Sequence, residues 1–409
     1  MIPRPARRKS GRRTRRLRRS AGLALLGPAL ILAGFHGAAA ADRPCVWTGI
    51  ERIVAVGDLH GDLKNFLKIL GPEGTKLIDR EDKDAHWTGG KTHLVQMGDV
   101  MDRGDYAKDI FDLIRRLEKE AVAAGGMVHL LIGNHEEMNI LNFSFRYNYV
   151  TMNQFKSFLP KDYVESKEAK FKQKTGNGGD TAEMWEELIA DHDAQLYYTR
   201  AFNRDYGKWI AEHNAVIKIN DVVFLHAGFS EGFSNWKIET INAVLTKELK
   251  ACINDVEYEG VPSSAARSRV VYQPQGPLWY RDLVTKDEAL MQDEFNRILA
   301  NLGAKYMVVA HTPLQSAVAL EYMKRFEGRL FMIDTSISSF MGMGGRLSAL
   351  IIEKGQFSVW PPEEREPRAG RPGNGAHPSA GRKVNHEEDR SGNVVSMGVR
   401  RLRPDSPLP

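Results

Sequence analysis

Short apolar runs recur along this chain, and each is bounded by glycine or polar residues. Runs of this length and spacing predict buried β-strands. Two of them, at 330–333 and 347–352, lie in the last quarter of the chain. Five others lead directly into a residue that can bind a metal or a phosphate, and they span residues 54–56, 94–97, 130–132, 222–225 and 308–310.

Between the strands, apolar residues recur at helical spacing, as in residues 106–124, where most of them fall on one face. Alternating strands and helices predict a layered α/β (α+β) fold. From about residue 139 to residue 214 the strand pattern is absent, and the chain is aromatic and charged. We therefore predict a mainly helical insert at about 139–214. It follows the third strand-end loop directly, so it can shape the access of a substrate.

Both ends of the chain differ in composition from the middle. Residues 1–41 combine clustered arginines, an apolar stretch at 21–35 and alanines at 38–41, which is the pattern of a signal peptide. The apolar stretch is short for a transmembrane helix, so we expect export to the periplasm or the medium without stable membrane insertion after cleavage. A retained anchor is the alternative, and the Sec and twin-arginine routes both stay open.

Residues 361–409 are rich in Pro, Gly, Arg and Ser, and this composition predicts a disordered tail. One catalytic domain then remains at 42–360.

The charge of the chain changes once the leader is set aside. The 409 residues carry a formal net charge of +5, but residues 1–41 hold ten basic groups and no acid. The remainder has 47 basic and 52 acidic groups, so no nucleic-acid partner is expected.

Two cysteines, Cys45 and Cys252, lie beyond the expected cleavage point. Export permits a disulfide between them, and two independent thiols are the alternative.

The loops after the five strands hold carboxylates, imidazoles and an amide. Ligands bind outside the carboxyl ends of strands in open α/β sheets, so we expect these groups to meet in one crevice as a two-metal site. Asp99 ends the second strand and is the natural bridge between two cations. The candidate metal ligands are Asp58, His60, Asp99, Asn134, His226 and His311. Mixed oxygen and nitrogen ligands suit Mn, Fe or Zn, and two such cations make a bound hydroxide available as the nucleophile near neutral pH.

Neighbouring residues suit a phosphoester substrate. Arg103 and Arg281 can clamp phosphoryl oxygens with bidentate donors, and Asn134 is a further candidate for phosphate binding. His135 can protonate the leaving oxygen, with Asp102 orienting the ring and raising its pKa. Each motif alone is typical of a turn, but five in this order indicate a site. The remaining histidines lack such motifs and are interpreted as structural or exposed, namely His86, His93, His129, His192 and His213.

These motifs together resemble the calcineurin-like metallophosphoesterases, in the phosphoprotein phosphatase branch. The matching segments are Gly57-Asp58-x-His60-Gly61, Gly98-Asp99-x-x-Asp102-Arg103-Gly104, Gly133-Asn134-His135-Glu136, the strand-end His226 and Ala310-His311-Thr312. The resemblance implies a β-sandwich flanked by helices and a dinuclear phosphomonoesterase with a histidine general acid. It also implies two ligand sets, with the first metal on Asp58, His60 and Asp99 and the second on Asp99, Asn134, His226 and His311.

Two departures separate this chain from the familiar serine/threonine phosphatases, namely Ile132 before the Gly-Asn-His-Glu motif and Ala227 after the strand-end histidine. With its leader and helical insert, it resembles the bacterial Shewanella-like protein phosphatases instead. We therefore expect a phosphoprotein substrate and favour phosphotyrosine over phosphoserine or phosphothreonine. Aromatic residues after the acid-bearing loop can line a deep approach or pack the insert, and these are Phe143, Phe145, Tyr147 and Tyr149.

Two alternatives to a protein phosphatase remain at this stage. The same metal site could hydrolyse a dinucleoside polyphosphate or another small phosphoester. A protein of a different class, an inactive exported metal-binding or scaffolding protein, could keep the fold without turnover. Every expected ligand and acid position is filled in this sequence, which favours an enzyme.

Overall fold

The computed structural model describes residues 43–176, 180–259, 270–314, 319–342 and 345–362. All of them belong to the first of two units, which ends at Glu363. The predicted signal peptide at 1–41 lies outside the described residues, and so does the predicted tail apart from positions 361 and 362.

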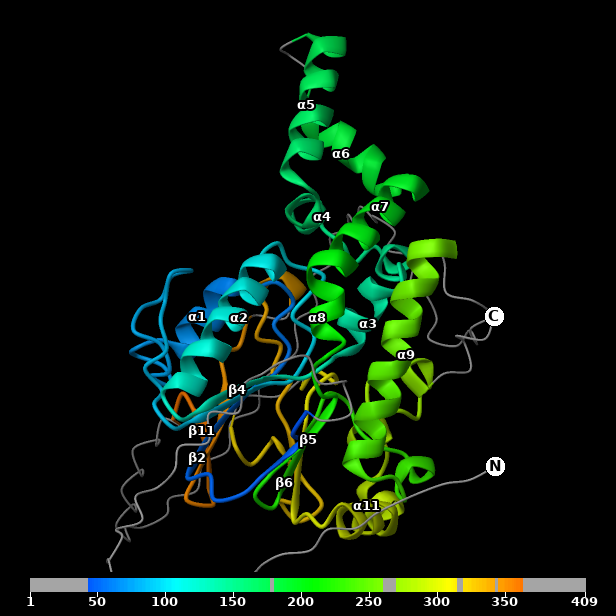
Figure 1. Cartoon of the computed structure of the whole chain (residues 1–409). Helices are drawn as coiled ribbons and strands as arrows, with labels where there is room; N and C mark the ends of the chain where they lie inside the picture. The colour runs from blue at the N-terminus through cyan, green and yellow to red at the C-terminus, as the bar shows by residue number, and fades with distance from the viewer. Residues whose placement is uncertain (1–42, 177–179, 260–269, 315–318, 343–344, 363–409) are drawn as a thin grey trace, which may run out of the picture. The chain divides into compact units, whose positions relative to one another are not determined.

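Two mixed sheets form the centre of this unit (Figure 1). The five-stranded sheet has the order β11(Gln356–Trp360), β10(Ala349–Glu353), β2(Arg52–Val56), β3(His93–Gln96), β4(Met127–Leu130). The six-stranded sheet has the order β1(Val46–Trp47), β5(Val216–Ile219), β6(Val222–Leu225), β7(Tyr306–Val309), β9(Leu330–Met332), β8(Lys324–Arg325).

Each sheet contains a parallel core. In the five-stranded sheet β2, β3 and β4 run parallel, while β10 and β11 pair antiparallel at one side. In the six-stranded sheet β6, β7 and β9 run parallel, with β5 antiparallel to β6 and β8 antiparallel to β9. The strand-end loops thus come from two sheets, as the resemblance to a β-sandwich fold implied. Three of the five predicted loops leave one sheet and two leave the other, and the strand-end rule holds in each sheet separately.

The two sheets pack face to face, as the sequence resemblance implied. Strand β2 is buried on both faces, and its residues alternate between two apolar clusters. Ile53 and Ala55 belong to the cluster that joins the sheets, together with Phe224 of β6 and Val308 of β7. Val54 on the opposite face belongs to the cluster that includes the helices. This period of two places one face of each parallel core in the sandwich and the other under helices.

The helices around the sheets are α1(Leu63–Leu70), α2(Ala107–Ala123), α3(Asn134–Ile140), α9(Ile238–Glu259), α10(Asp282–Thr285) and α11(Glu288–Leu302). Helix α2 confirms the helix predicted at 106–124, and its buried side includes Ile110, Leu113 and Leu117. It packs along β4, whereas α9 packs along β5 (Figure 1). Short helical turns complete the unit, namely η2(Ser144–Tyr147), η3(Asn203–Gly207), η4(Glu231–Phe233), η6(Val270–Tyr272) and η7(Ser339–Met341).

The predicted insert is helical and contains no strand in its described parts, 139–176 and 180–214. Its helices are α4(Met152–Phe158), α5(Lys161–Thr175), α6(Thr181–Ala190), α7(His192–Phe202) and α8(Lys208–Ile210). Helices α4 and α7 bury aromatic residues, while α5 has no buried residue and contacts α6 (Figure 1). Among the described helices of the whole chain, we find none with the length and apolar character needed to cross a membrane.

Candidate active site

The loops at the strand ends adopt a backbone conformation that is unfavourable for ordinary residues. Five non-glycine residues there have positive φ, namely His60 (41°), Asp99 (53°), Asp102 (68°), Arg103 (69°) and His311 (64°). Such conformations cost of order 1–3 kcal/mol each and persist only where surrounding contacts enforce them. Their concentration at the predicted ligands indicates that these loops are shaped for chemistry at the expense of local stability.

Close backbone approaches explain two of the motif glycines. A Cβ on Gly133 would lie 2.3 Å from Asp99 Oδ1, and a Cβ on Gly61 would lie 2.5 Å from the carbonyl carbon of Gly104. The buried Glu136 ties these loops together, because its carboxylate accepts the N–H groups of Asp99 at 2.8 Å and Gly133 at 2.9 Å. Glu136 had no predicted role, although it lies in the Gly133-Asn134-His135-Glu136 motif.

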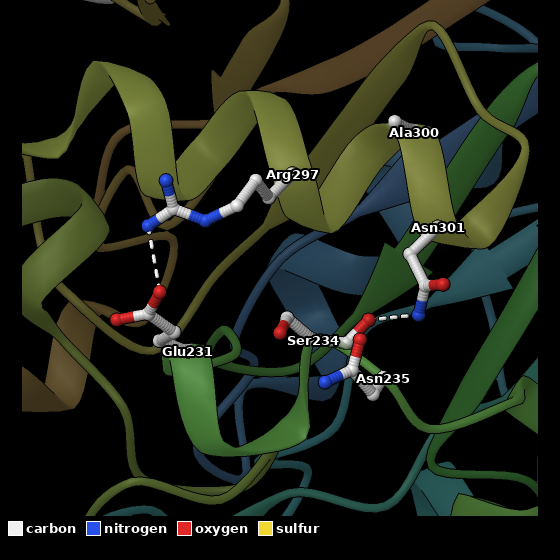
Figure 2. Close-up of a pocket in the computed structure, with 6 residues that line it drawn as sticks. All are labelled: Glu231, Ser234, Asn235, Arg297, Ala300 and Asn301. Carbon is white, nitrogen blue, oxygen red and sulfur yellow. Dashed lines mark hydrogen bonds and ion pairs between the residues drawn. The ribbon is translucent and has the colours of Figure 1, made fainter.

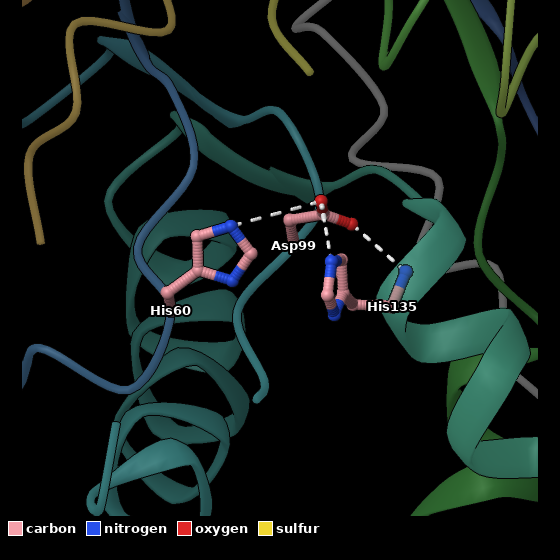
Figure 3. Close-up of side chains that lie close together, drawn as sticks. All are labelled: His60, Asp99 and His135. Carbon is pink, nitrogen blue, oxygen red and sulfur yellow. Dashed lines mark hydrogen bonds and ion pairs between the residues drawn. The ribbon is translucent and has the colours of Figure 1, made fainter. Parts of the chain in front are cut away.

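His60, Asp99 and His135 form the first group that can hold a metal ion (Figure 3). Asp99 Oδ2 lies 4.0 Å from His60 Nε2 and 3.8 Å from His135 Nε2. His60 Nδ1 donates to the carbonyl oxygen of Met101 at 3.0 Å, so the Nε2 of a neutral ring carries the lone pair. The three side chains come from loops after β2 and β3 and from the first turn of α3.

Asp99, His226 and His311 form the second group. His226 Nε2 lies 3.3 Å from Asp99 Oδ1, 3.0 Å from Asn134 Oδ1 and 3.1 Å from His311 Nδ1. Asp99 thus directs one oxygen toward each group, which is the position of a bridging ligand. The structure brings together a dinuclear set of histidine and aspartate ligands from both sheets.

The chemistry of these donors fits cations. His226 Nδ1 donates to the carbonyl oxygen of Met97 at 2.8 Å, which leaves Nε2 as a lone pair facing the oxygens of Asp99 and Asn134. Converging lone pairs repel one another unless a cation lies between them. In the described part of the chain, the buried His311 Nε2 also lacks a hydrogen-bond partner.

Electrostatics favour neutral imidazoles at His60 and His311 and an ionised bridging carboxylate. Burial, with help from His135, lowers the pKa of His60 to about 3. Burial and the neighbouring His226 likewise hold the pKa of His311 well below its usual value. Burial acts to raise the pKa of Asp99, but His226, His135 and His60 together hold it well below its usual range. Neutral imidazole and ionised carboxylate are the forms that bind metals.

Asp58 lies beside the second group and outside both triads. Its Oδ1 accepts the His311 N–H at 3.3 Å and lies 3.9 Å from His226 Nδ1. Burial and the charges of Asp334 and Asp99 raise its pKa well above the usual value. Asp334, which sequence analysis missed, is itself buried in the loop after β9. Three carboxylates in one dry site destabilise one another without cations, while the assignment of Asp58 as a ligand stays a prediction.

His135 and Asp102 form the predicted pair. His135 Nδ1 lies 2.8 Å from Asp102 Oδ2, and both side chains are buried. Burial alone would lower the pKa of His135, but Asp99 and Asp102 outweigh burial and raise it. Because His135 also belongs to the first triad, its position allows either a proton donor or a metal ligand.

The two predicted arginines flank the site. Arg281 donates to the carbonyl oxygen of His311 at 2.8 Å. Burial lowers the pKa of its guanidinium, and the charges of Asp58 and Asp99 oppose that shift. Arg103 Cζ lies 4.8 Å from the centre of the Tyr149 ring. Arg281 thus lies beside the second group, and Arg103 lies over a ring that adjoins His135, while their assignment as phosphate clamps stays a prediction.

The four aromatic candidates separate into two kinds. Phe145 is buried with its ring 5.3 Å from that of Tyr198, so it packs the insert. Phe143 packs with its ring 5.8 Å from that of Tyr272. Tyr149 has its ring 5.1 Å from His135 and stacks at 5.4 Å on Tyr147, which is 46% exposed. Of the four candidates, Tyr149 therefore borders the acid directly, and Tyr147 adjoins it through the Tyr149 ring.

A polar cavity of about 520 Å³ lies elsewhere, between η4 and α11 (Figure 2). An ion pair of 2.7 Å joins Glu231 and Arg297 across it. None of the predicted site residues lines it, and its lining is Glu231, Ser234, Asn235, Arg297, Ala300 and Asn301. Cys45 and Cys252 are both buried, and no disulfide bond joins them in the described part of the chain.

This two-sheet architecture with a shared dinuclear ligand set defines a metal-dependent phosphoesterase. The calcineurin-like phosphoesterase profile matches residues 51–315, and the chain belongs to that family. It is related to the Shewanella-like protein phosphatases. The chain is 27% identical over 305 residues to Shewanella-like protein phosphatase 1 of Plasmodium berghei, covering 73% of this chain and 70% of the relative. It is 31% identical over 223 residues to Shewanella-like protein phosphatase 2 of Arabidopsis thaliana, covering 50% and 52%.

A solved structure gives the same fold. The cold-active protein-tyrosine phosphatase of a psychrophilic Shewanella species superposes with a TM-score of 0.55 at 25% identity, covering 78% of this chain and 80% of that chain. The predicted family and its fold of two sheets flanked by helices are thereby confirmed. The chain is an enzyme, a metal-dependent phosphoric ester hydrolase.

Proposed function

We propose that this protein is a dinuclear-metal protein phosphatase that removes phosphate from phosphotyrosine. The observation that carries the proposal is the position of Asp99, whose two oxygens face two different histidine groups from loops of both sheets. Asn134 joins the second group, and Asp58 lies beside it. These oxygen and nitrogen donors suit Mn, Fe or Zn. Bound there, such metals supply Lewis acidity and an activated water nucleophile.

The protein's own residues hold the substrate and move a proton. Arg103 and Arg281 bind phosphoryl oxygens, with the planar fork of each guanidinium matching two oxygens. His135 donates the proton on Nε2 to the leaving oxygen as the phosphorus–oxygen bond breaks. Asp102 accepts the Nδ1–H of the same ring at 2.8 Å, which holds Nε2 toward the site.

The tyrosine pair supports phosphotyrosine as the substrate. A phosphotyrosine ring holds its phosphate farther from the peptide backbone than a phosphoserine does, so it needs an apolar wall beside the catalytic groups. Tyr149 and the half-exposed Tyr147 offer such a wall next to His135 and Arg103. Aromatic rings in this arrangement favour an offset or edge contact with a further ring, worth about 0.5–1.5 kcal/mol beyond area burial.

A direct assay tests both parts of the proposal. The purified full chain, loaded with Mn, Fe or Zn in turn, is given matched phosphotyrosine and phosphoserine peptides and a dinucleoside polyphosphate. The expected result is a higher kcat/KM for phosphotyrosine. A tenfold or larger excess for phosphoserine, about 1.4 kcal/mol, would overturn the substrate while keeping the metal chemistry. A preference for the dinucleotide would make the enzyme a small-phosphoester hydrolase.

Export is a separate part of the proposal, supported by the basic, apolar and alanine-rich order of residues 1–41. Fractionation of cells that produce the full chain, followed by N-terminal sequencing of the mature protein, tests it. We expect mature protein in an exported fraction with an N-terminus near residue 42. An intact N-terminus in the cytoplasmic fraction would contradict export.

A further inference from the structure

The helical insert is joined to the catalytic loop by a continuous set of short polar contacts. Arg103 N–H donates to the carbonyl oxygen of Tyr149 at 2.7 Å. The carboxylate of Asp105 accepts the Thr151 hydroxyl at 2.7 Å and the Asn153 amide at 3.0 Å. Thr151 is also the N-cap of α4, because its hydroxyl oxygen accepts the Gln154 N–H at 3.1 Å. The start of α4 is thus fixed to the loop that carries Asp102 and Arg103.

Gln154 is the residue of α4 that reaches the catalytic pair. Its Nε2 donates to Asp102 Oδ1 at 2.9 Å, and its Oε1 accepts the Asp102 N–H at 2.7 Å. Both the side chain and the backbone of Asp102 are therefore held by one amide. Gln154 is fully buried, as is Asp102, so water does not compete for these bonds.

The remaining partners of Asp102 also come from outside the motif loop. Asn139 donates to Oδ1 at 2.9 Å and Ser144 donates to Oδ2 at 2.7 Å. Tyr198 of α7 extends the network, since its hydroxyl donates to Asn139 Oδ1 at 3.0 Å and accepts from Gln154 at 3.1 Å. The carboxylate that orients His135 is thus saturated, and two of the residues in this network belong to helices of the insert.

We propose that Gln154 is a positioning residue, which fixes the Asp102 carboxylate against His135, so that the helical insert sets the efficiency of proton donation to the leaving group. This inference rests on the proposed function, in which His135 is the acid. Asp102 has a φ of 68°, a strained conformation that needs contacts of this kind to persist. With the amide removed, Asp102 keeps the bonds from Asn139 and Ser144 but loses one donor to Oδ1 and the acceptor of its own N–H, so the carboxylate holds the His135 ring less firmly.

The leaving group provides a readout that a purely structural role would not move. The phenolate that leaves from phosphotyrosine belongs to a phenol with a pKa of about 10, so its departure needs a proton donor. The serine alkoxide is a stronger base, and its departure depends on the proton donor even more strongly. The nitrophenolate of p-nitrophenyl phosphate leaves readily without one. A displaced acid therefore slows the peptides selectively, whereas general damage to the site slows all three substrates alike.

The test compares Gln154→Met with Gln195→Met in the full chain. Gln195 lies in α7 and donates to the carbonyl oxygen of Ile189 at 2.7 Å, within the insert and without a contact to Asp102. We expect Gln154→Met to lower kcat on phosphotyrosine and phosphoserine peptides by about tenfold or more, with KM within about twofold. Turnover of p-nitrophenyl phosphate should fall less than about threefold, and Gln195→Met should change none of these values.

Equal losses on all three substrates, or identical behaviour of the two methionine variants, would overturn the inference. If Gln154→Met does not fold, Tyr198→Phe applies the same comparison with the loss of one hydroxyl. His135→Asn separates this failure from failure of the proposed function. A parent enzyme without turnover, or a His135→Asn variant with unchanged selectivity among leaving groups, refutes the proposed acid itself.

Discussion

Two groups of buried histidines in this protein have opposite surroundings. His60, His226 and His311 lie just beyond the ends of strands, where each belongs to a triad that includes Asp99. In His60 and His226 the Nδ1–H donates to a backbone carbonyl oxygen, which leaves Nε2 of each ring able to bind a cation. The carboxylate supplies the negative charge that a cation needs.

His93 and His129 lie within β3 and β4 and are also buried. Their rings meet at 3.0 Å between Nδ1 of His93 and Nε2 of His129, and the Trp47 ring lies 4.4 Å from that of His129. No carboxylate joins them in the described groups that could hold a metal. Both residues are buried inside strands, which agrees with their interpretation as structural residues.

The comparison shows that burial and proximity of imidazoles do not by themselves make a metal site. The histidines inside the strands are constrained by the sheet to face one another and Trp47. The histidines beyond the strand ends lie on loops that can turn, and those turns bring them to Asp99. The position of a residue relative to the strand end therefore decides its chemistry here.

Removal of the shared Asp99 carboxylate should have the largest effect, because it takes away the group that distinguishes the loop histidines from the strand histidines. Asp99→Asn should lose most bound metal and lower kcat/KM by more than roughly 10⁴-fold, because cations worth several kcal/mol each are lost. Elemental analysis and a phosphatase assay measure both effects. Asp221→Asn, which disrupts a surface ion pair of 2.7 Å to Lys305, is the matched control and should keep metal and activity. Retained metal in Asp99→Asn would show that Asp99 is not the bridge.

Substitution of His135 should have the next largest effect. His135→Asn should keep the metals and lower kcat by roughly 10²–10⁴-fold, the range for a positioned acid. The exposed His86, which pairs with Glu120 at 2.8 Å, provides the control His86→Asn, and this variant should behave like the parent. A parallel loss of metal and activity in His135→Asn would make His135 a ligand of the first triad.

Arg281 tests the side of the site that receives phosphate. Arg281→Lys keeps the charge and loses the fork, so KM for the phosphoester should rise by about tenfold and inhibition by inorganic phosphate should weaken. The control is Arg297→Lys, at the ion pair with Glu231 shown in Figure 2. Steady-state kinetics that do not distinguish Arg281→Lys from the control would remove Arg281 from the site.

The buried strand histidine His93 should make the free energy of unfolding depend on pH. Burial lowers the pKa of His93 to about 4, so the unfolded chain binds a proton below about pH 6.5 that the folded chain does not bind. This histidine contributes stability above pH 6.5, and the contribution is lost as the pH falls toward 4. His93→Gln should reduce the slope of unfolding free energy against pH in this window by up to about 1.4 kcal/mol per unit. Denaturant unfolding of parent, His93→Gln and His86→Gln measures the slopes, and equal slopes for all three would contradict it.

Much of the metal centre could be predicted from sequence because its residues lie in short motifs at strand ends. His226 and His311 each follow an apolar run directly, and Asp99 follows one after a single glycine, so local pattern and strand geometry suffice to bring them together. The division of the loops between two sheets could not be derived this way, since pairing of strands depends on contacts far apart in sequence. Only the resemblance to a known family indicated the sandwich.

The support of the acid could not be predicted. Gln154 lies 52 residues after Asp102, and nothing in its own neighbourhood marks it as a partner of a catalytic carboxylate. Asp334 and Glu136 were missed for similar reasons, because a buried carboxylate acquires its role from packing. The aromatic candidates show the same limit, since four residues of one pattern divided into packing residues and a pair beside the site only in three dimensions.

The most direct test of the central claim is the activity of the parent enzyme as a function of its metal content. Exhaustive chelation, followed by elemental analysis and assay on a phosphotyrosine peptide, gives that relation. We expect two metal ions per chain in the active enzyme, loss of nearly all turnover on stripping, and recovery when Mn, Fe or Zn is restored. Full activity in protein stripped of metal would contradict the dinuclear mechanism.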